Sequence, residues 1–380
     1  MHLTDEAQMV REMVRGFAEN ELRPIAAEID REERFPHESI DKMRELGLLG
    51  ITIPEEEGGS GMDTLCYAVT VEELARVCGS TALILAAHIS LACQPIHLFG
   101  NPSQKEKYLP SLASGDVIGS YGLTEPDAGS DAGATKTTAR LDGDEWVVNG
   151  SKMWITNALQ SRTMVFTART GGEEEGTRDI SSFIVDPAVE GVTVNPIMGK
   201  LGVRGSTTCE VVFEDVRIPA DDLLGDPGRG FKQFLTILDG GRISIGAMAL
   251  GLAQGAYEEA LRFTQEREQF GRPVAKFQAV AFTLAEMATR IKAARLLVYD
   301  SAVRKDAGEN IIVDSAMAKY YASETAQWVC TRAIQLHGGY GYTKEYPVER
   351  MWRDAKLTTI GEGTSEIQLL VISREILNEL

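Results

Sequence analysis

One glutamate near the end of the chain is flanked by glycine on both sides. It is Glu362, in the sequence TIGEGTSEIQ that runs from Thr359 to Gln368. Glycine adopts backbone conformations that other residues avoid, so Gly361 and Gly363 allow a tight turn that aims the carboxylate in one direction. A carboxylate held in this way can act as a general base. A solvated acid in an ordinary turn is the simpler interpretation, and this stretch by itself favours it.

Three further stretches carry residue types that can hold a cofactor. The Gly129–Asp131 turn in YGLTEPDAGSDAG can direct backbone N–H groups and a hydroxyl at an anionic ligand, although an ordinary β-turn would have the same sequence. Trp154 and Thr156, in KMWITNA, could stack on a planar ring and bond its polar edge, or Trp154 could be a core residue. Arg267, in QEREQFGRPVAKFQ, could bind a pyrophosphate or lie free at the surface.

Other motifs are excluded by their context. The G-G-x-G run that starts at Gly338 follows a predicted helix rather than a strand, which argues against a dinucleotide-binding fold. The five cysteines are scattered and form no C-x-x-C pair, so no structural zinc site is expected. His88, Cys93 and His97 share one apolar helical stretch, where we expect core or pocket residues rather than metal ligands.

The elements that position these residues are predicted to follow the order helices, sheet, helices. Apolar residues at helical spacing from Val10 to Phe17 predict a first helix, with Thr4 as its N-cap. Between about 119 and 227, short β-rich runs are separated by glycine and aspartate turns, which predicts a compact antiparallel sheet domain. Long apolar stripes over 278–339 then predict a helical bundle.

Composition narrows the class of protein. With 380 residues, of which 43% are hydrophobic and 25% charged, the chain can fold into two or three packed units. A formal net charge of −18 argues against nucleic-acid binding, because few cations are available to neutralise phosphates. The most apolar run, STALILAAHISLACQPI, is shorter than a membrane span, and the N-terminal sequence has the pattern of a capped helix rather than of a signal peptide. These features predict a soluble intracellular protein.

Together and in this order, the motifs resemble those of the acyl-CoA dehydrogenase family along essentially the whole chain. The first family signature is matched by Gly122-Leu123-Thr124-Glu125 followed by Gly129-Ser130-Asp131. The second is matched by Gln335, Gly338, Gly339, Gly341, Tyr342, Glu345, Arg350 and Asp354. GEGTSEIQ then falls where the family keeps its catalytic base.

The resemblance implies an α+β multidomain fold. Its parts would be an N-terminal α-helical domain (1–118), a central antiparallel β-sheet domain (119–228) and a C-terminal four-helix bundle (229–380). It also implies FAD as the cofactor, no metal, and the conversion of an acyl-CoA thioester to a trans-2-enoyl-CoA. The cofactor site would be shared across a subunit boundary, as in the homotetramers, dimers of dimers, that most relatives form.

By the same resemblance, Glu362 is the base that takes the α-proton while the β-hydrogen leaves as hydride to the flavin. Substrate contacts are expected from Ser130, Asp239, Arg242 and Gly363. The expected cofactor residues are Tyr121, Leu123, Thr124, Gly129, Ser130, Trp154, Ile155, Thr156, Arg267, Gln269, Phe270, Gln278, Gln335, Gly339, Thr364 and Glu366.

Three positions narrow the substrate that the resemblance implies. Relatives specific for isovaleryl and long-chain substrates place their base at the position of Gly241, so those specificities are not expected. Glutaryl-CoA enzymes have an arginine at the position of Ala82, which argues against a dicarboxylic substrate. Many straight-chain enzymes have an aromatic residue where this chain has Gly361, which suggests branched or alicyclic acyl groups of short to medium length.

Two other functions remain open. An acyl-CoA oxidase shares the fold but passes electrons to oxygen, and usually has a C-terminal extension that this sequence, ending at Leu380, does not show. A catalytically silent acyl-CoA-binding protein would lack the base.

For the dehydrogenase, electron-transfer flavoprotein is the expected electron acceptor. A start at Met1 without a transit peptide favours a bacterial cytoplasm over a mitochondrial matrix.

Overall fold

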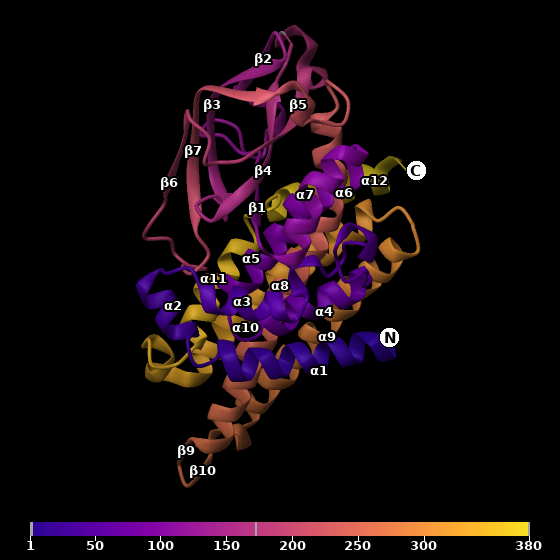
Figure 1. Cartoon of the computed structure of the whole chain (residues 1–380). Coiled ribbons are helices and arrows are strands. Elements are labelled where there is room, and N and C mark those ends of the chain that lie inside the picture. The colour runs from indigo at the N-terminus through magenta and orange to yellow at the C-terminus, as the bar shows by residue number, and fades with distance from the viewer. Residues whose placement is uncertain (1–2, 172, 379–380) are drawn as a thin grey trace.

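The computed structural model describes residues 3–171 and 173–378. A β-sheet domain lies at one end of the molecule, and helices from both halves of the chain pack against each other below it (Figure 1). The last helix before the sheet ends at Ser114, and the first helix after it begins at Gly230. The predicted α+β arrangement of helices, sheet and helices is confirmed.

The N-terminal part is helical. Its α-helices are α1 (Asp5–Phe17), α2 (Ala26–Glu32), α3 (His37–Glu45), α4 (Thr64–Ala75), α5 (Gly79–Ala87), α6 (Gln94–Phe99) and α7 (Pro102–Ser114). The Thr4 hydroxyl accepts a hydrogen bond from the α1 backbone at 3.1 Å, which confirms Thr4 as the N-cap. Val10, Val14 and Phe17 are buried, whereas Met13 lies at the edge of the apolar stripe and is 37% exposed.

The apolar helix that includes His88 is longer than the sequence predicts. α5, a π-helical segment at His88–Cys93 and α6 together form 21 helical residues from Gly79 to Phe99, which is long enough to cross a membrane. Among the described residues, the long helix α8 (Gly230–Glu266) passes the same test of length and hydropathy. In their most apolar windows, 72% and 78% of the residues are buried inside the protein, as in core helices.

The sheet domain follows α7. Its strands are β1 (Ile118–Gly122), β2 (Thr138–Asp142), β3 (Glu145–Thr156), β4 (Ser161–Arg169), β5 (Ile180–Val185), β6 (Val192–Pro196), β7 (Thr208–Pro219) and β8 (Leu223–Leu224). They are ordered β6-β7-β3-β2-β4-β5-β8, with β1 beside β4. Most pairs are antiparallel as predicted, but β1 runs parallel to β4, and β2 meets β4 in parallel at one residue. Phe166 stacks on Phe183 and Phe213 in the core, with ring centroids 5.5 and 4.8 Å apart.

The C-terminal part is built around α8. Its other elements are a β9 (Glu268–Gln269) and β10 (Arg272–Pro273) hairpin, α9 (Gln278–Asp306), α10 (Ile312–His337), α11 (Val348–Thr358) and α12 (Ser365–Asn378). α8 packs on α4, α9, α10 and α11. Gly251 and Gly255 allow α4 to approach α8 closely. A Cβ at Gly251 would lie only 2.2 Å from a carbonyl oxygen of α4, and a Cβ at Gly255 only 2.1 Å from the carbonyl oxygen just after α4.

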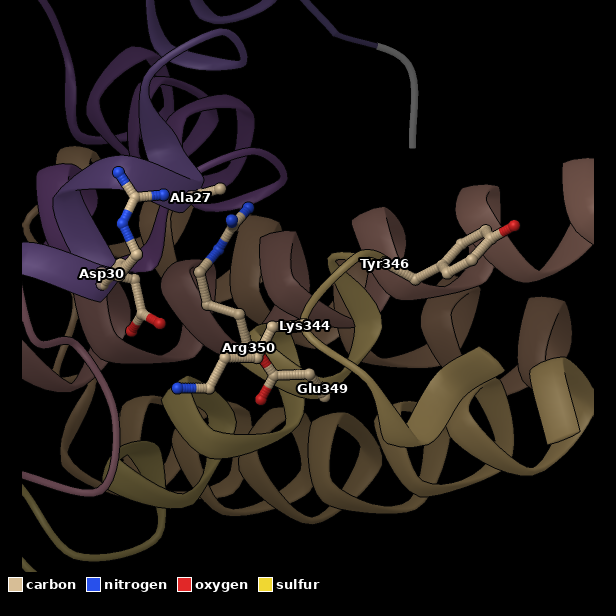
Figure 2. Close-up of a pocket in the computed structure, with 7 residues that line it drawn as sticks. Ala27, Asp30, Lys344, Tyr346, Glu349 and Arg350 are labelled. Atoms are coloured by element: carbon tan, nitrogen blue, oxygen red, sulfur yellow. The ribbon is translucent and has the colours of Figure 1, made fainter. Parts of the chain in front are cut away.

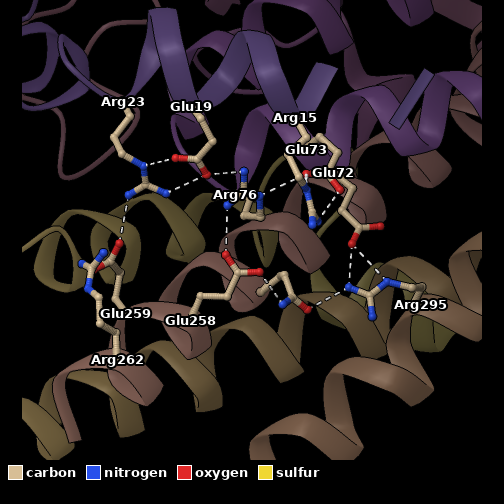
Figure 3. A network of polar contacts seen from close by, with 11 residues as sticks. Arg15, Glu19, Arg23, Glu72, Glu73, Arg76, Glu258, Glu259, Arg262 and Arg295 are labelled. Carbon is tan, nitrogen blue, oxygen red and sulfur yellow. Dashed lines mark hydrogen bonds and ion pairs between the residues drawn. The ribbon is translucent and has the colours of Figure 1, made fainter. Parts of the chain in front are cut away.

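A network of ion pairs joins the two helical parts (Figure 3). Arg76, just after α4, is 3% exposed and pairs with Glu73 at 3.0 Å and with Glu258 of α8 at 2.9 Å. Arg295 of α9 pairs with Glu72 at 2.6 Å. Buried charges without partners are strongly destabilising, so these pairs hold α4, α8 and α9 in one arrangement.

Candidate active site

The base candidate Glu362 lies in the turn between α11 and α12. Its φ is +51° and that of Gly363 is +86°, a left-handed region that glycine adopts without strain and glutamate does not. The carboxylate oxygen Oε2 is fully enclosed and has no hydrogen-bond partner among the described residues. It lies against α8, since a Cβ at Gly241 would be only 2.1 Å from it. An enclosed, unpaired carboxylate oxygen on a strained turn indicates a functional constraint.

The surroundings of Glu362 tune its protonation. Burial raises the pKa of the Glu362 carboxyl to about 7, because enclosure in the protein disfavours the charged form. The positive charges of Lys319 and Arg242 act in the opposite direction and limit that rise. At neutral pH the carboxyl therefore exchanges a proton readily, as a general base must.

Lys319 is a site residue that the sequence analysis missed. It lies on α10, is fully buried, and its Nζ donates a hydrogen bond to the carbonyl of Gly363. Burial lowers the pKa of Lys319 to about 8, while the charge of Glu362 opposes that change. The signal in the sequence was a single lysine within the apolar segment SAMAKYYAS, which could equally have been a surface residue.

Asp239 and Arg242 pair on the same helix as Gly241. The Arg242 Nη1 atom donates to Asp239 Oδ1 at 2.7 Å, and Arg242 is 4% exposed. Within 3–171 and 173–378, the buried Nε of Arg242 has no hydrogen-bond partner. Arg242 thus lies near the base with an unused donor, and Asp239 is its partner. The substrate contacts expected of Asp239 and Arg242 remain predictions.

The first signature forms a loop after β1, beside the end of β3. The Met153 N–H donates to the Thr124 carbonyl at 2.7 Å, which places Thr124 next to Trp154. Trp154 has a φ of +65° and is 59% exposed, so it is not the core tryptophan of the alternative interpretation. Leu123 is half-buried in this loop. The loop and the tryptophan together present an open aromatic surface.

The outer part of this loop is open to a ligand. Gly129 and Ser130 are exposed, and a Cβ at Gly129 would meet nothing within 4 Å. Thr156 is half-buried at the end of β3. Ile155 is 2% exposed in the sheet core, so only its backbone can face a ligand.

A buried ion pair anchors this loop. Lys152 is fully buried, and its Nζ lies 2.7 Å from Glu125 Oε1 and 3.1 Å from the Leu123 carbonyl. Glu125 also accepts hydrogen bonds from the backbone N–H groups of Lys136 at 2.6 Å and Thr137 at 3.0 Å. The pair therefore fixes both ends of the 123–137 loop.

The strand that leads into the loop packs on α8, the helix that also contacts the base. Tyr121 is buried at the end of β1, its hydroxyl has no partner among the described residues, and its ring stacks on Phe234 of α8 at 6.3 Å. Gly241 follows Phe234 by seven residues, or about 10 Å along the helix. Thr364 and Glu366 follow the base directly, where the Thr364 hydroxyl accepts from the first turn of α12 at 3.3 Å.

The other predicted cofactor residues lie at the opposite end of the molecule. They are Arg267, Gln269, Phe270, Gln278, Gln335 and Gly339. Arg267 directly follows the last residue of α8. It lies 26 residues beyond Gly241, which is about 39 Å along the axis of this helix. The β9–β10 hairpin projects from the end of the bundle that is remote from the sheet (Figure 1). Within one chain, these residues cannot reach the ligand that Trp154 would cover.

The second signature is partly structural. Asp354 accepts from the Val203 N–H at 2.6 Å, and Arg350 donates to the Val77 carbonyl at 3.2 Å, so both tie α11 to neighbouring segments. Arg350 also lines a pocket of about 70 Å³ with Asp30 and Glu349 (Figure 2). That pocket is too small for an acyl-CoA or a flavin and contains none of the predicted catalytic or ligand-binding residues.

Comparison with known proteins decides the family. Residues 4–116, 120–216 and 228–377 match the N-terminal, middle and C-terminal domains of acyl-CoA dehydrogenase. The chain belongs to the acyl-CoA dehydrogenase family. It is therefore an oxidoreductase that acts on CH–CH bonds. The family's C-terminal domain carries Glu362, and its middle domain carries the loop around Thr124.

Relatives of known description cover the whole chain. The short-chain-specific acyl-CoA dehydrogenase of Clostridium acetobutylicum is 52% identical, with 99% of both chains covered. The butyryl-CoA dehydrogenase structure from Megasphaera elsdenii has a TM-score of 0.97 and 42% identity, with 99% of both chains covered. A chain in a structure described as an electron transferring flavoprotein of Acidaminococcus fermentans has a TM-score of 0.98 and 46% identity, again with 99% of both covered.

Proposed function

We propose that this protein is an FAD-dependent acyl-CoA dehydrogenase in which Glu362 removes the α-proton of a short-chain acyl-CoA. The observation that carries the proposal is the enclosed, unpaired Oε2 of Glu362 against Gly241, with a pKa of about 7. A carboxylate in water, with a pKa of roughly 4, is too weak a base for a thioester α-proton. Enclosure strengthens the base and excludes water from it.

The turn that aims the base also supplies a hydrogen-bond donor. Within the part of the chain that the structure describes, the backbone N–H of Glu362 donates to no protein group. A thioester carbonyl beside Glu362 would accept from this N–H as negative charge develops on its oxygen. When bound, FAD supplies the acceptor for the β-hydrogen. A single residue, Glu362, thus takes the α-proton with its side chain and binds the thioester carbonyl with its backbone N–H.

The residues around Trp154 fit the flavin ring of FAD. Its exposed ring, the open space at Gly129 and the unpaired Tyr121 hydroxyl offer a face for stacking and polar groups for a ring edge. We propose that Arg267 and Phe270 bind the pyrophosphate and adenosine part from a neighbouring subunit. Phe270 is 94% exposed in the single chain, which suits a residue that contacts another subunit. The assembly would be a homotetramer made of two such dimers.

The nucleotide part of CoA has a candidate site further along α8. A cleft of about 460 Å³ is lined in part by Arg229, Lys232 and Thr236. Asp239, Thr236 and Lys232 are spaced by three and four residues, so they share one face of α8. This face runs about 15 Å from Asp239 to Arg229. We propose that pantetheine follows the face and that the two cations bind the phosphates.

This assignment has a direct test. Lys232→Glu should raise KM for acyl-CoA about tenfold or more, and should leave KM for the matching N-acetylcysteamine thioester unchanged, because that substrate has no phosphate. Thr236→Ser serves as the matched control in the same cleft. Equal effects of Lys232→Glu on both thioesters would remove the phosphate site from this cleft.

The depth of the acyl site points to a short chain. Tyr67 of α4 is 4% exposed, and its hydroxyl donates to the Ala86 carbonyl at 3.2 Å. Burial raises the pKa of Tyr67, with Ser244 opposing the rise and Glu362 adding to it, so the phenol lies close to both. Gly241 and Ser244 are one turn apart on α8, about 5 Å. We propose that the Tyr67 ring closes the acyl site there.

Branched short acyl groups are the second candidate. Gly361, the residue before the base, has no side chain. A Cβ there would be in ordinary contact with Leu357 at 3.7 Å, so the glycine leaves free the space that a larger side chain would fill. The names of the relatives favour a straight short chain. A panel of butyryl-, hexanoyl-, isobutyryl- and 2-methylbutyryl-CoA decides between them.

The deciding experiment is an anaerobic titration of the FAD-loaded protein with this panel of thioesters. The absorbance of the oxidised flavin is the readout. One of the short thioesters should bleach the band in the parent and leave it unchanged in Glu362→Gln. No bleaching with any acyl-CoA, despite bound FAD, would refute the proposed function and favour an acyl-CoA-binding protein.

The electron acceptor is tested by reoxidation of the reduced protein. We propose electron-transfer flavoprotein, which the description of the Acidaminococcus fermentans structure supports, and a cytoplasmic location. Reoxidation by electron-transfer flavoprotein should be faster than by air. Faster reoxidation by oxygen would make the protein an acyl-CoA oxidase instead.

A further inference from the structure

Lys319 is a fully buried cation next to the base. Its side chain is 0% exposed, and its Nζ donates to the Gly363 carbonyl. An ammonium has three donors, yet no other hydrogen bond of Lys319 is found in the described part of the chain. Removing a lysine charge from water costs several kcal/mol unless an opposite charge compensates it. The position of Lys319 therefore calls for a negative partner.

The hydrogen bond to Gly363 restrains the turn that carries the base. The same carbonyl accepts from Gln368 Nε2 at 3.0 Å, and this amide nitrogen also lies 3.2 Å from the Glu362 carbonyl. Two donors thus hold the peptide groups that set the direction of the Glu362 side chain. Gly246 of α8 faces the same part of α10, where a Cβ would be in ordinary contact with the Lys319 Cα at 3.5 Å.

The charges around Lys319 come from three helices and from the turn that carries the base. Glu362 makes the largest attractive contribution, and Arg242 of α8 opposes it. Glu324 of α10 and Glu366 of α12 contribute less. Of the carboxylates around Lys319, Glu362 therefore favours its charged form most.

The groups that face Glu362 differ in how far they are already paired. Arg242 has Asp239 as its partner at 2.7 Å, and Lys305 of α9 also faces Asp239. The Tyr67 hydroxyl stays neutral because burial raises its pKa. Lys319 donates to the neutral Gly363 carbonyl and forms no ion pair with a carboxylate among the described residues, so its charge is not already neutralised by a close partner.

We propose that Lys319 is a positioning residue for Glu362. Its ammonium holds the Gly363 carbonyl, which fixes the turn, and its charge keeps the enclosed Glu362 in the carboxylate form that can accept a proton. This inference rests on the proposed function and assigns to that site the residue that keeps its base ready at neutral pH.

Three variants of Lys319 separate its charge from its hydrogen bond. Lys319→Met removes both, Lys319→Gln keeps an N–H donor without charge, and Lys319→Arg keeps both. The readout is the rate of flavin reduction by butyryl-CoA against pH, in FAD-loaded protein. In Lys319→Met and Lys319→Gln the rate at pH 6 should fall about tenfold, because an opposite charge nearby lowers a carboxyl pKa by about one or more. At pH 9 it should fall less than about threefold.

The conservative variant should restore the profile. Lys319→Arg is expected to follow the parent curve, whereas a merely structural role would lower the rate equally at all pH values. A flat loss in Lys319→Met, with no change in the shape of the profile, would overturn the proposal.

A second measurement needs no substrate and covers a variant that folds poorly. At pH 7 the change in melting temperature caused by Lys319→Met should be more unfavourable in the parent than in the Glu362→Gln background, because only the parent has both charges to stabilise each other. Failure of the single variant to fold and rescue by Glu362→Gln would support the proposal. An equal loss, or unfolding, in both backgrounds would overturn it.

The two proposals fail in different ways. If no acyl-CoA bleaches the parent flavin, the proposed function is wrong. The melting temperatures still measure the coupling of Lys319 to Glu362 in that case. If the parent is active and the coupling is absent, only the role of Lys319 is wrong.

Discussion

Gly241→Ala should separate catalysis from folding. The added Cβ would lie 2.1 Å from Glu362 Oε2 and 3.2 Å from its Cδ. Carbon and oxygen atoms that are not bonded stay more than about 3 Å apart, so the carboxylate has to move by about 1 Å. A displacement of this size at a reacting group costs about 100-fold in rate.

The fold should tolerate the same change. The clash involves the end of a side chain that can rotate, and Gly241 lies inside α8, where alanine is favoured over glycine by about 0.5–1 kcal/mol. We therefore expect a melting temperature equal to that of the parent or slightly higher. FAD content should not change either, because the three atoms nearest to the added Cβ all belong to Glu362 rather than to the loop around Thr124.

Single-turnover flavin reduction by butyryl-CoA measures the effect without interference from the electron acceptor. Gly240→Ala is the matched control, since its Cβ would lie 2.8 Å from Lys305 Nζ, the end of a flexible side chain. We expect Gly241→Ala to be about 100-fold slower and Gly240→Ala to stay within about threefold of the parent. A Gly241→Ala protein with more than a third of the parent rate would refute the placement of the base against α8.

Three other outcomes are expected. Lys152→Met leaves Glu125 buried without its cation, so the free energy of unfolding should fall by about 3–5 kcal/mol, and FAD should dissociate more easily; unchanged denaturant midpoints and flavin retention would contradict the anchoring role. Because burial raises the pKa of Glu362 to about 7, the folded protein holds this proton more tightly than the unfolded chain does. The contribution of Glu362 to folding stability is therefore present below pH 4.5 and is lost as the pH rises through 7. Glu362→Gln should be more stable than the parent by up to about 3 kcal/mol at pH 8 and equally stable at pH 4. Thermal unfolding of both proteins at both pH values checks the sign. Phe270→Ala should leave the secondary structure unchanged but weaken FAD binding at least about tenfold; unchanged FAD affinity would remove this residue from the shared site.

Much of the fold was predictable from local sequence. Helical spacing from Val10 to Phe17, the Thr4 cap and the β-rich runs between 119 and 227 depend on residues that are neighbours along the chain. The parallel pairing of β1 with β4 was missed, because strand partners more than 40 residues apart leave no local signal. The 21-residue apolar helix from Gly79 to Phe99 was also underestimated, since a π-helical segment carries it through His88 and Ser90.

The sequence by itself determined the family motifs and the residues that we propose carry the chemistry. The order of the motifs points to Glu362 as the base and to Thr124 and Trp154 as flavin neighbours, because such motifs are short and local. It did not determine the surroundings that make the base work.

The tertiary structure alone decided those surroundings. The contact of Glu362 with Gly241 joins residues 121 positions apart, and Lys319 reaches the Gly363 carbonyl from a third helix. α8 also places Arg267 about 39 Å along its axis from Gly241, the residue against which tertiary packing sets Glu362. The burial of a side chain and its hydrogen-bond partners depend on which distant segments of the chain pack together. The free energy of the whole fold determines which segments do so.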